Sequence, residues 1–242
     1  RPLIVGNAQV MRDAFGSLGA QARAIEIREV QGPGDIAASP GVVSVLDPHN
    51  LNPEDIVVGE ASAAAGKASM EWAELAARLC LSGGVQGMAT APLNKAAAAL
   101  AGYEEIGHTE LLQSLTQAPQ VATMLMSGTL RVVHLTTHRS LRDACDAVTR
   151  DNVLAKVKLT HDYFVQWGFP RPCIGVAALN PHASDGGLVG DEEATAIEPA
   201  VADARALGIE ATGPVPADTV FNQAIDGAYD AVLAMYHDQG HI

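Results

Sequence analysis

Residues 230–237 read DAVLAMYH, six apolar residues in a row between an aspartate and a histidine. A short, continuous apolar run is typical of a parallel strand with both faces buried, so we expect a strand whose carboxyl end delivers His237. Two other apolar runs end in the same way, one just before His138 and one just before His182. In open α/β sheets ligands bind outside the carboxyl ends of the strands, so this repeated pattern predicts an α/β fold with its site at that edge.

The rest of the chain alternates apolar runs with helical patterns, which favours a mostly parallel sheet covered by helices. We expect strands over residues 2–6, 22–30, 41–47, 85–90, 129–137, 173–179 and 230–236, and helices over residues 7–19, 61–81, 92–102, 141–167 and 191–208. Ser140 is the expected cap of the longest helix. Hydrophobic residues make up 48% of the chain and aromatic residues only 4%, so alanine, valine and leucine must supply the core.

The charge balance excludes some partners. Lysine and arginine number 15 and aspartate and glutamate 28, so the net charge is 15 − 28 = −13. Such an acidic chain is not expected to bind nucleic acid or an anionic membrane, and it must gather its cations locally to handle an acidic substrate. The three cysteines have no CxxC spacing, and we expect them to be reduced thiols.

No apolar run approaches the roughly 18 residues of a membrane span, and no cationic, apolar leader is present. We therefore expect a cytoplasmic protein. The chain opens at Arg1 without a methionine and closes at Ile242 just after a strand, so we expect both ends to belong to a longer protein.

The three histidines that follow strands, His138, His182 and His237, form the main candidate site. Three neutral imidazoles from separate strands would make a catalytic metal site with one position left open. Asp238 would bind the metal indirectly or orient an imidazole. The alternative is that each histidine is only a loop residue, since no two of them are close in sequence.

Four further residues are weaker candidates. His108 and Thr109 open a helix, where free N–H groups favour an anion, although Thr109 could simply be a cap. Lys95 begins another helix and could pair with a carboxylate or phosphate, or be a solvated surface lysine. Asp218, in a proline-rich loop, could take a proton or hold a hydroxyl, or only form a turn. Of the remaining histidines, His241 is a weaker candidate for the same crevice, whereas His49, His134 and His161 are expected to be turn, packing or surface residues.

Six blocks carry a family resemblance: TAPLNK, GHTELL, TTHRSL, NPHASDGGLVGDEE, GPVPADTVF and AMYHDQGH, in this order. Together they resemble the 4-hydroxythreonine-4-phosphate dehydrogenase family of vitamin B6 biosynthesis, and the match runs from the first strand to the last residue. The resemblance implies a two-lobed fold like that of isocitrate and isopropylmalate dehydrogenases. Residues 1–103 would form the cofactor lobe, 104–234 the substrate, metal and dimer lobe, and 235–242 the start of a return to the first lobe.

The resemblance also implies cofactors and site residues. A divalent metal (zinc, magnesium, cobalt or manganese) would be held by His138, His182 and His237, in a site shared across a homodimer. His108 and Thr109 would contact a small anionic substrate, and Asp218 and Asp238 would lie in the same site. NAD or NADP would bind without a GxGxxG loop, which explains why the chain has neither that motif nor a phosphate-binding GxxxxGK[ST] loop. The expected reaction is oxidation of a β-hydroxy acid followed by decarboxylation.

Two departures bear on the substrate. Ser184 and Asp185 stand where the family is expected to have glycine and glutamate, and Arg139 stands where it has an apolar residue. An added cation beside the metal ligands favours a substrate with a second carboxylate over one with a phosphate. The main prediction is 4-phosphohydroxy-L-threonine; the related alternatives are threonate or erythronate 4-phosphate and the cis-dihydrodiol of terephthalate.

Two functions of other classes stay open. The same histidines could activate water in a metal-dependent hydrolase. Alternatively, the protein could be a non-catalytic remnant that binds a small acid or a partner.

Overall fold

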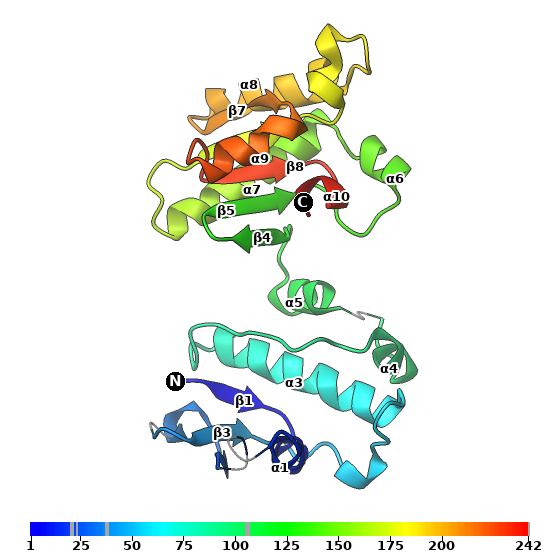
Figure 1. Cartoon of the computed structure of the whole chain (residues 1–242), viewed down its shortest axis with the longest axis vertical. Helices are drawn as coiled ribbons and strands as arrows, with labels where there is room; N and C mark the ends of the chain where they lie inside the picture. Colours follow the sequence, from blue (N-terminus) through cyan, green and yellow to red (C-terminus); the bar gives the residue numbers. More distant parts are fainter. Residues whose placement is uncertain (20–21, 23, 37–38, 105–106, 242) are drawn as a thin grey trace. The chain divides into compact units, whose positions relative to one another are not determined.

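The computed structural model describes residues 1–242 except 20–21, 23, 37–38, 105–106 and 242. The chain forms two compact units, Arg1–Pro119 and Gln120–Ile242 (Figure 1). We call them the first and the second unit. Among the described residues, no helix combines the length and the apolar character needed to cross a membrane.

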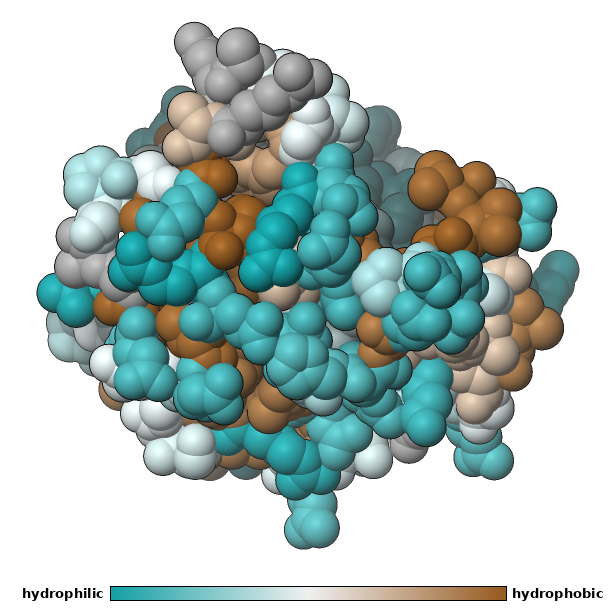
Figure 2. Space-filling model, turned by 90° about the horizontal axis from the view of Figure 1, so that it is seen from below, coloured by the Kyte–Doolittle hydropathy of each residue, from teal (hydrophilic) through white to brown (hydrophobic). Residues whose placement is uncertain are grey.

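The first unit contains a three-stranded parallel sheet, in the order β1-β3-β2, and four α-helices among its described residues. The helix α3 is the longest of them and contacts β1, α4 and α5. The elements are β1 (Leu3–Val5), α1 (Ala8–Ser17), β2 (Glu26–Glu29), η1 (Pro33–Asp35), β3 (Val42–Leu46), η2 (Pro53–Asp55), α3 (Ala63–Leu81), α4 (Lys95–Leu100) and α5 (His108–Thr116). Figure 2 views the chain from below the orientation of Figure 1 and shows a mainly hydrophilic face with separate hydrophobic areas.

The strand expected over residues 85–90 does not form. Residues 85–90 form an irregular, mostly exposed segment that has no strand partner among the described residues. Gly87 lies at its centre and weakens strand formation, and the described sheet of this unit pairs only β1, β3 and β2.

The second unit contains a five-stranded sheet in the order β4-β5-β8-β6-β7. Only β4 is antiparallel, and it forms a hairpin with β5. The strands are β4 (Met124–Ser127), β5 (Leu130–His134), β6 (Cys173–Ala177), β7 (Glu210–Val215) and β8 (Ala231–Ala234). The helical elements are α6 (Leu141–Asp146), α7 (Arg150–Gln166), η3 (Pro181–Gly186), η4 (Glu193–Ile197), α8 (Glu198–Ala206), α9 (Ala217–Ile225) and α10 (His237–Gly240). The predicted α/β class with a mostly parallel, helix-covered sheet is therefore confirmed.

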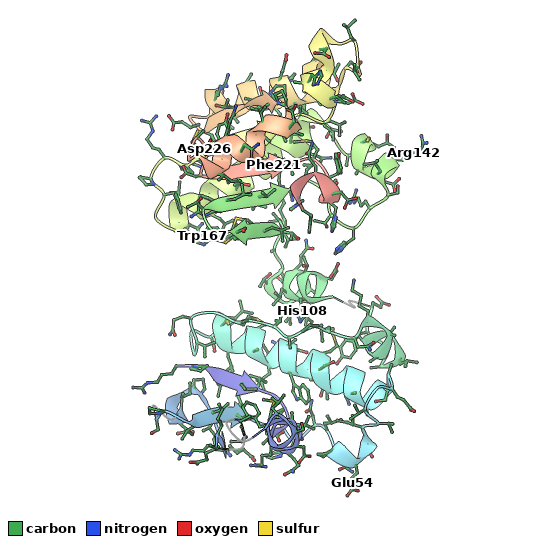
Figure 3. The ribbon with its side chains drawn as sticks, in the orientation of Figure 1. Glu54, His108, Arg142, Trp167, Phe221 and Asp226 are labelled. Atoms are coloured by element: carbon green, nitrogen blue, oxygen red, sulfur yellow. The ribbon has the colours of Figure 1, made fainter. Side chains whose placement is uncertain are left out.

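Helices cover both faces of this sheet. Val133, Val176 and Leu233 pack with residues of α7 and α8, whereas Val132 and Ala177 pack with Phe221 and its neighbours in α9 (Figure 3). Successive strand residues point to opposite faces, so two buried faces need an apolar residue at every position. This is why the central strands appear in the sequence as unbroken apolar runs.

The long helix predicted over residues 141–167 is two helices, α6 and α7. Ser140 caps the first as predicted, since its hydroxyl accepts a hydrogen bond from Asp143 N at 3.2 Å. Thr149 lies between the two helices in an extended conformation, and its hydroxyl accepts from Asn152 N. Threonine favours such a cap position, so a new helix begins at Arg150.

The two units meet in the chain between Pro119 and Gln120, and the lobe boundary expected at residue 103 stays a prediction. Leu111 of α5 packs with Met70 of α3 and Ala98 of α4, so the helix that begins at His108 belongs to the first unit. Residues 235–241 belong to the second unit, where α10 contacts β5 and β8. That the chain returns to the first lobe after residue 234 stays a prediction.

A buried carboxylate holds the chain just before His182. Glu193 is 2% exposed. It accepts hydrogen bonds from Leu179 N at 2.8 Å, from Asn180 N at 2.7 Å and from Asn180 Nδ2 at 2.9 Å. Burial alone raises the pKa of Glu193, but these hydrogen bonds to the ionised form outweigh it and the pKa lies below its ordinary value.

We expect Gly66→Ala to destabilise the first unit. Alanine normally stabilises a helix by about 1 kcal/mol relative to glycine. Here an added methyl would collide with the Ala97 carbonyl of α4, so we expect a net loss of about 1–3 kcal/mol in the free energy of unfolding, measured in urea. Gly16→Ala is the control, because a methyl at that position of α1 meets nothing within 4 Å among the residues that the structure describes. Equal stability of both variants would contradict the close packing of α3 on α4.

We expect Glu193→Gln to destabilise the second unit in a pH-dependent way. The glutamine NH2 would face the amide of Asn180, so the loss should be about 1–3 kcal/mol near neutral pH. The pKa of Glu193 is lowered on folding, so its stabilisation is present above the unfolded pKa of about 4.3 and disappears as the pH falls through the folded pKa. Urea midpoints from about pH 3 to about pH 7 should therefore converge for wild type and variant in acid. Glu198→Gln, exposed in α8, is the control. A stability difference between wild type and Glu193→Gln that does not change with pH would refute the role of the Glu193 charge.

Candidate functional site

The strand order places the three histidine-bearing segments side by side. β5, β8 and β6 are consecutive neighbours in the sheet, and all three are parallel. His138 follows β5, His237 begins α10 directly after β8, and His182 lies in η3 after β6. All three strands therefore end at one edge, as the sequence predicted.

Two of the predicted metal ligands are close together. The ring centroids of His138 and His237 are 5.7 Å apart. Among the described residues, no group of three or more histidine, cysteine, aspartate or glutamate side chains is arranged to hold a metal ion. The predicted three-histidine metal site stays a prediction.

The donor chemistry nevertheless fits a cation. His237 Nδ1 lies 2.7 Å from Asp238 Oδ1, and His182 Nδ1 lies 3.2 Å from Asp185 Oδ2. A carboxylate on one ring nitrogen is the usual partner of a histidine that binds metal through the other. In both residues Nε2 is thus the nitrogen left to bind a ligand.

The segment carrying His182 has an unusual backbone. His182, Ala183, Ser184 and Asp185 have φ values of 52°, 54°, 63° and 45°. The left-handed region costs about 1–2 kcal/mol for a residue other than glycine. Such strain persists only where the surroundings fix it, and here Glu193 holds the residues just before the turn. Ser184, one of the two departures from the family pattern, is thus a serine at a position where glycine would be unstrained.

Buried polar side chains link the three strand ends. The hydroxyl of Thr136, just after β5, donates to Met235 O at 2.9 Å. Gln239 is 5% exposed. Its Oε1 accepts from Met235 N and its Nε2 donates to Ala178 O, both at 2.7 Å. These bonds fix the loops that carry the histidines.

Sequence reasoning assigned no role to Thr136, Glu193 or Gln239. All three lie inside quoted blocks, TTHRSL, NPHASDGGLVGDEE and AMYHDQGH. Their position within the blocks was the available signal, but the partners that give them a role, such as Met235 O for Thr136 and Ala178 O for Gln239, are set by the fold.

Two more histidines extend the cluster inward. The ring of His241 stacks on His237 at 3.7 Å, and its Nδ1 lies 2.7 Å from His237 O. His241 also contacts the buried ring of His134, at a centroid distance of 4.9 Å. Burial lowers the pKa of His134, so this residue is a neutral packing histidine, as expected. His241 lies beside the predicted ligand His237, as the sequence suggested.

The remaining candidates are distributed over both units. Asp218 is exposed in the first turn of α9, rather than in a loop, and α9 contacts η3, which carries His182. Asp238 is exposed beside His237. His108, Thr109 and Lys95 begin α5 and α4 in the first unit, with His108 shown in Figure 3, so their place in a common site stays a prediction.

Comparison with known proteins gives consistent matches. The family model described as pyridoxal phosphate biosynthetic protein PdxA matches residues 1–242. The chain is 42% identical over 242 residues to the 4-hydroxythreonine-4-phosphate dehydrogenase of Geobacter metallireducens, covering 100% of this chain and 70% of that protein. It is also 42% identical over 218 residues to the D-threonate 4-phosphate dehydrogenase of Salmonella typhimurium, covering 90% of this chain and 67% of that protein.

A solved structure agrees. The crystal structure of 4-hydroxythreonine-4-phosphate dehydrogenase from Klebsiella pneumoniae matches with a TM-score of 0.93 and 42% identity, covering 99% of this chain and 72% of that one. This match is consistent with the predicted isocitrate dehydrogenase-like fold and confirms the resemblance drawn from the six blocks. Because the family model spans residues 1–242, the chain belongs to the pyridoxal phosphate biosynthetic protein PdxA family.

Proposed function

We propose that this chain belongs to a dehydrogenase that oxidises the hydroxyl of 4-phosphohydroxy-L-threonine, with NAD or NADP and a divalent metal, and then releases CO2. Its relatives are named dehydrogenases of phosphorylated hydroxy acids. The observation that carries the proposal is the edge formed by β5, β8 and β6, where three adjacent parallel strands end in histidines. Nothing in these relatives' names supports the hydrolase alternative.

His138, His182 and His237 would hold the cation through ring nitrogens. Bound there, a divalent cation would act as a Lewis acid that lowers the pKa of the substrate hydroxyl. Asp238 and Asp185, close to Nδ1 of His237 and His182, would keep the proton on that nitrogen and leave Nε2 free to bind the cation. Neutral imidazoles add no charge, so a bound cation would keep its full charge.

The reaction requires one base, one acid and one hydride acceptor. We assign the hydroxyl proton to a carboxylate, Asp218 or Asp238; a bound nicotinamide would supply the acceptor for hydride from the hydroxyl-bearing carbon. The bond to the carboxyl group then breaks, CO2 leaves, and the electron pair stays on the remaining enolate. Lys95 would return a proton to the carbon that lost CO2, and His108, Thr109 and Arg139 would bind the anionic groups of the substrate.

A second substrate is supported equally by the comparisons. The D-threonate 4-phosphate dehydrogenase is as similar to this chain as the 4-hydroxythreonine-4-phosphate dehydrogenase, at 42% identity in both cases. Both substrates are phosphorylated four-carbon hydroxy acids, so the same edge would serve either. We also propose that the protein is a cytoplasmic homodimer with a shared site.

We expect His182→Ala in the full-length protein to lower bound metal and turnover by at least about 100-fold, because a ligand is lost from the predicted set. Metal content by mass spectrometry and nicotinamide reduction by absorbance measure the two effects. His161→Ala is the control, since His161 lies in α7 and pairs with Asp162. Undiminished metal content and turnover in His182→Ala would remove the reaction centre from this proposal.

We expect 4-phosphohydroxy-L-threonine to yield reduced nicotinamide and CO2 in equal amounts. D-Threonate 4-phosphate, erythronate 4-phosphate and the terephthalate dihydrodiol are the comparison substrates, each tested with NAD and with NADP. The highest kcat/KM identifies the substrate. A hydrolysis product without nicotinamide reduction would support the hydrolase instead.

A further inference from the structure

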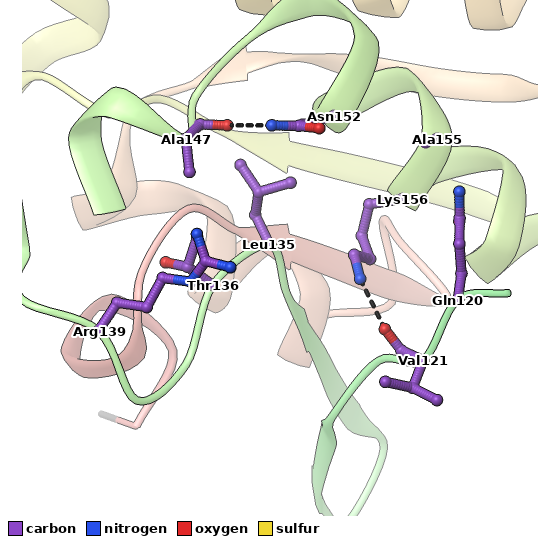
Figure 4. A pocket seen from close by; sticks show the side chains of 9 residues that line it. All are labelled: Gln120, Val121, Leu135, Thr136, Arg139, Ala147, Asn152, Ala155 and Lys156. Atoms are coloured by element: carbon purple, nitrogen blue, oxygen red, sulfur yellow. Dashed lines mark hydrogen bonds between the residues drawn. The ribbon is translucent and has the colours of Figure 1, made fainter. Parts of the chain in front are cut away.

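The second unit contains a cavity of about 240 Å³, whose lining includes Thr136 and Arg139 from the segment that carries the predicted ligand His138 (Figure 4). Its polar lining includes two cations, Arg139 and Lys156, and two amides, Gln120 and Asn152, but no carboxylate. This is unexpected in a chain with 28 acidic and 15 basic residues. The cavity is thus a local region of positive charge.

Lys156 is a partly buried cation that lacks an acidic partner. Its Nζ donates to Val121 O at 2.7 Å (Figure 4). An ammonium group has three donors, and this is the one hydrogen bond of Nζ found among the described residues. Burial lowers the pKa of Lys156, because desolvation disfavours the charged ammonium form.

Arg139 enters the cavity from a different element. It lies in the loop after β5, whereas Lys156 lies in α7, and in Figure 4 Leu135 lies between the two side chains. Neither cation forms an ion pair with a carboxylate in the part of the chain that the structure describes. By contrast, ion pairs engage the cations of five other residues: Arg28, Lys67, Arg78, Arg150 and Arg171.

The size of the cavity restricts its occupant. Pockets for drug-sized ligands are about 300–1,000 Å³, so this space suits a small group. Carboxylate and phosphate oxygens accept hydrogen bonds from both ammonium and guanidinium groups, and such charge-assisted bonds are strong. The apolar side of the lining, from Val121 and Leu135, would strengthen them by excluding water.

We propose that Arg139 and Lys156 form an anion subsite that receives a carboxylate or phosphate of the substrate. Arg139 directly follows the predicted ligand His138 in the chain, so we assign this subsite to the metal-binding end of the proposed site. As an assignment of substrate contacts, the inference rests on the proposed function. Anion binding itself does not depend on the reaction.

The first test measures binding without turnover. Inorganic phosphate and malonate are titrated into the full-length, metal-free protein by calorimetry, which separates phosphate from carboxylate preference. Lys156→Met keeps the apolar stem and removes the charge, and we expect it to weaken binding by about 10- to 100-fold. Lys158→Met, exposed two residues further along α7, should bind as wild type does, and Lys156→Arg should recover part of the affinity. Arg139→Gln, in an exposed loop, tests the second cation without disturbing the helix.

The second test measures kinetics with the substrate identified above. Lys156→Met should raise KM by a similar factor with little change in kcat, because an anion contact of equal strength in the ground and transition states contributes to binding and not to the chemical step. The subsite would be overturned if phosphate and malonate each bound every variant as tightly as wild type. It would also be overturned if neither anion bound to wild type. Anion binding that depends on Lys156 in a protein without dehydrogenase activity would overturn the proposed function and keep the subsite. Dehydrogenase activity with an unchanged KM in Lys156→Met would overturn the subsite and keep the proposed function.

Discussion

The hydrogen bonds of Gln239 are the constraint on which the site depends. One buried amide joins the backbone just after β8, at Met235, to the backbone just after β6, at Ala178. Thr136, just after β5, bonds to the same residue, Met235. Each bond satisfies a buried polar group that would otherwise be costly to leave unpaired, so the three strand ends are held in one arrangement. The histidine-bearing loops start from this fixed edge.

Beyond that edge the three loops differ. His237 and His138 are neighbours, and His241 and His134 continue the row of rings into the sheet. His182 lies in a left-handed turn whose preceding residues are held by the ionised Glu193. Strain in the turn and a buried charge beside it are both sustained by hydrogen bonding, a combination that often accompanies function. The proposed metal chemistry would use this turn to bring the third imidazole.

Charge is distributed unevenly in this acidic chain. Most acidic residues are on the surface, whereas Arg139 and Lys156 line a cavity without a carboxylate. Such an arrangement lets a protein of net charge −13 bind a small anion, because the local field at a site matters more than the total charge. The serine and aspartate that depart from the family pattern lie in the turn of His182, next to the carboxylate that fixes it.

The sequence by itself determined the α/β class, the buried strands, the Ser140 cap and the three histidines that follow strands. These follow from local patterns, because a strand buried on both faces must be apolar throughout and a helix needs a capping side chain. It did not predict the strands β4 and β7, the break at Thr149 or the loss of a strand at residues 85–90. It also gave no role to Thr136, Glu193 and Gln239. Tertiary structure decided these features, since a strand needs a neighbour with free backbone groups and a buried side chain acquires its role from partners distant in sequence. Gln239 and Ala178 are 61 residues apart, and only folding brings them within 2.7 Å.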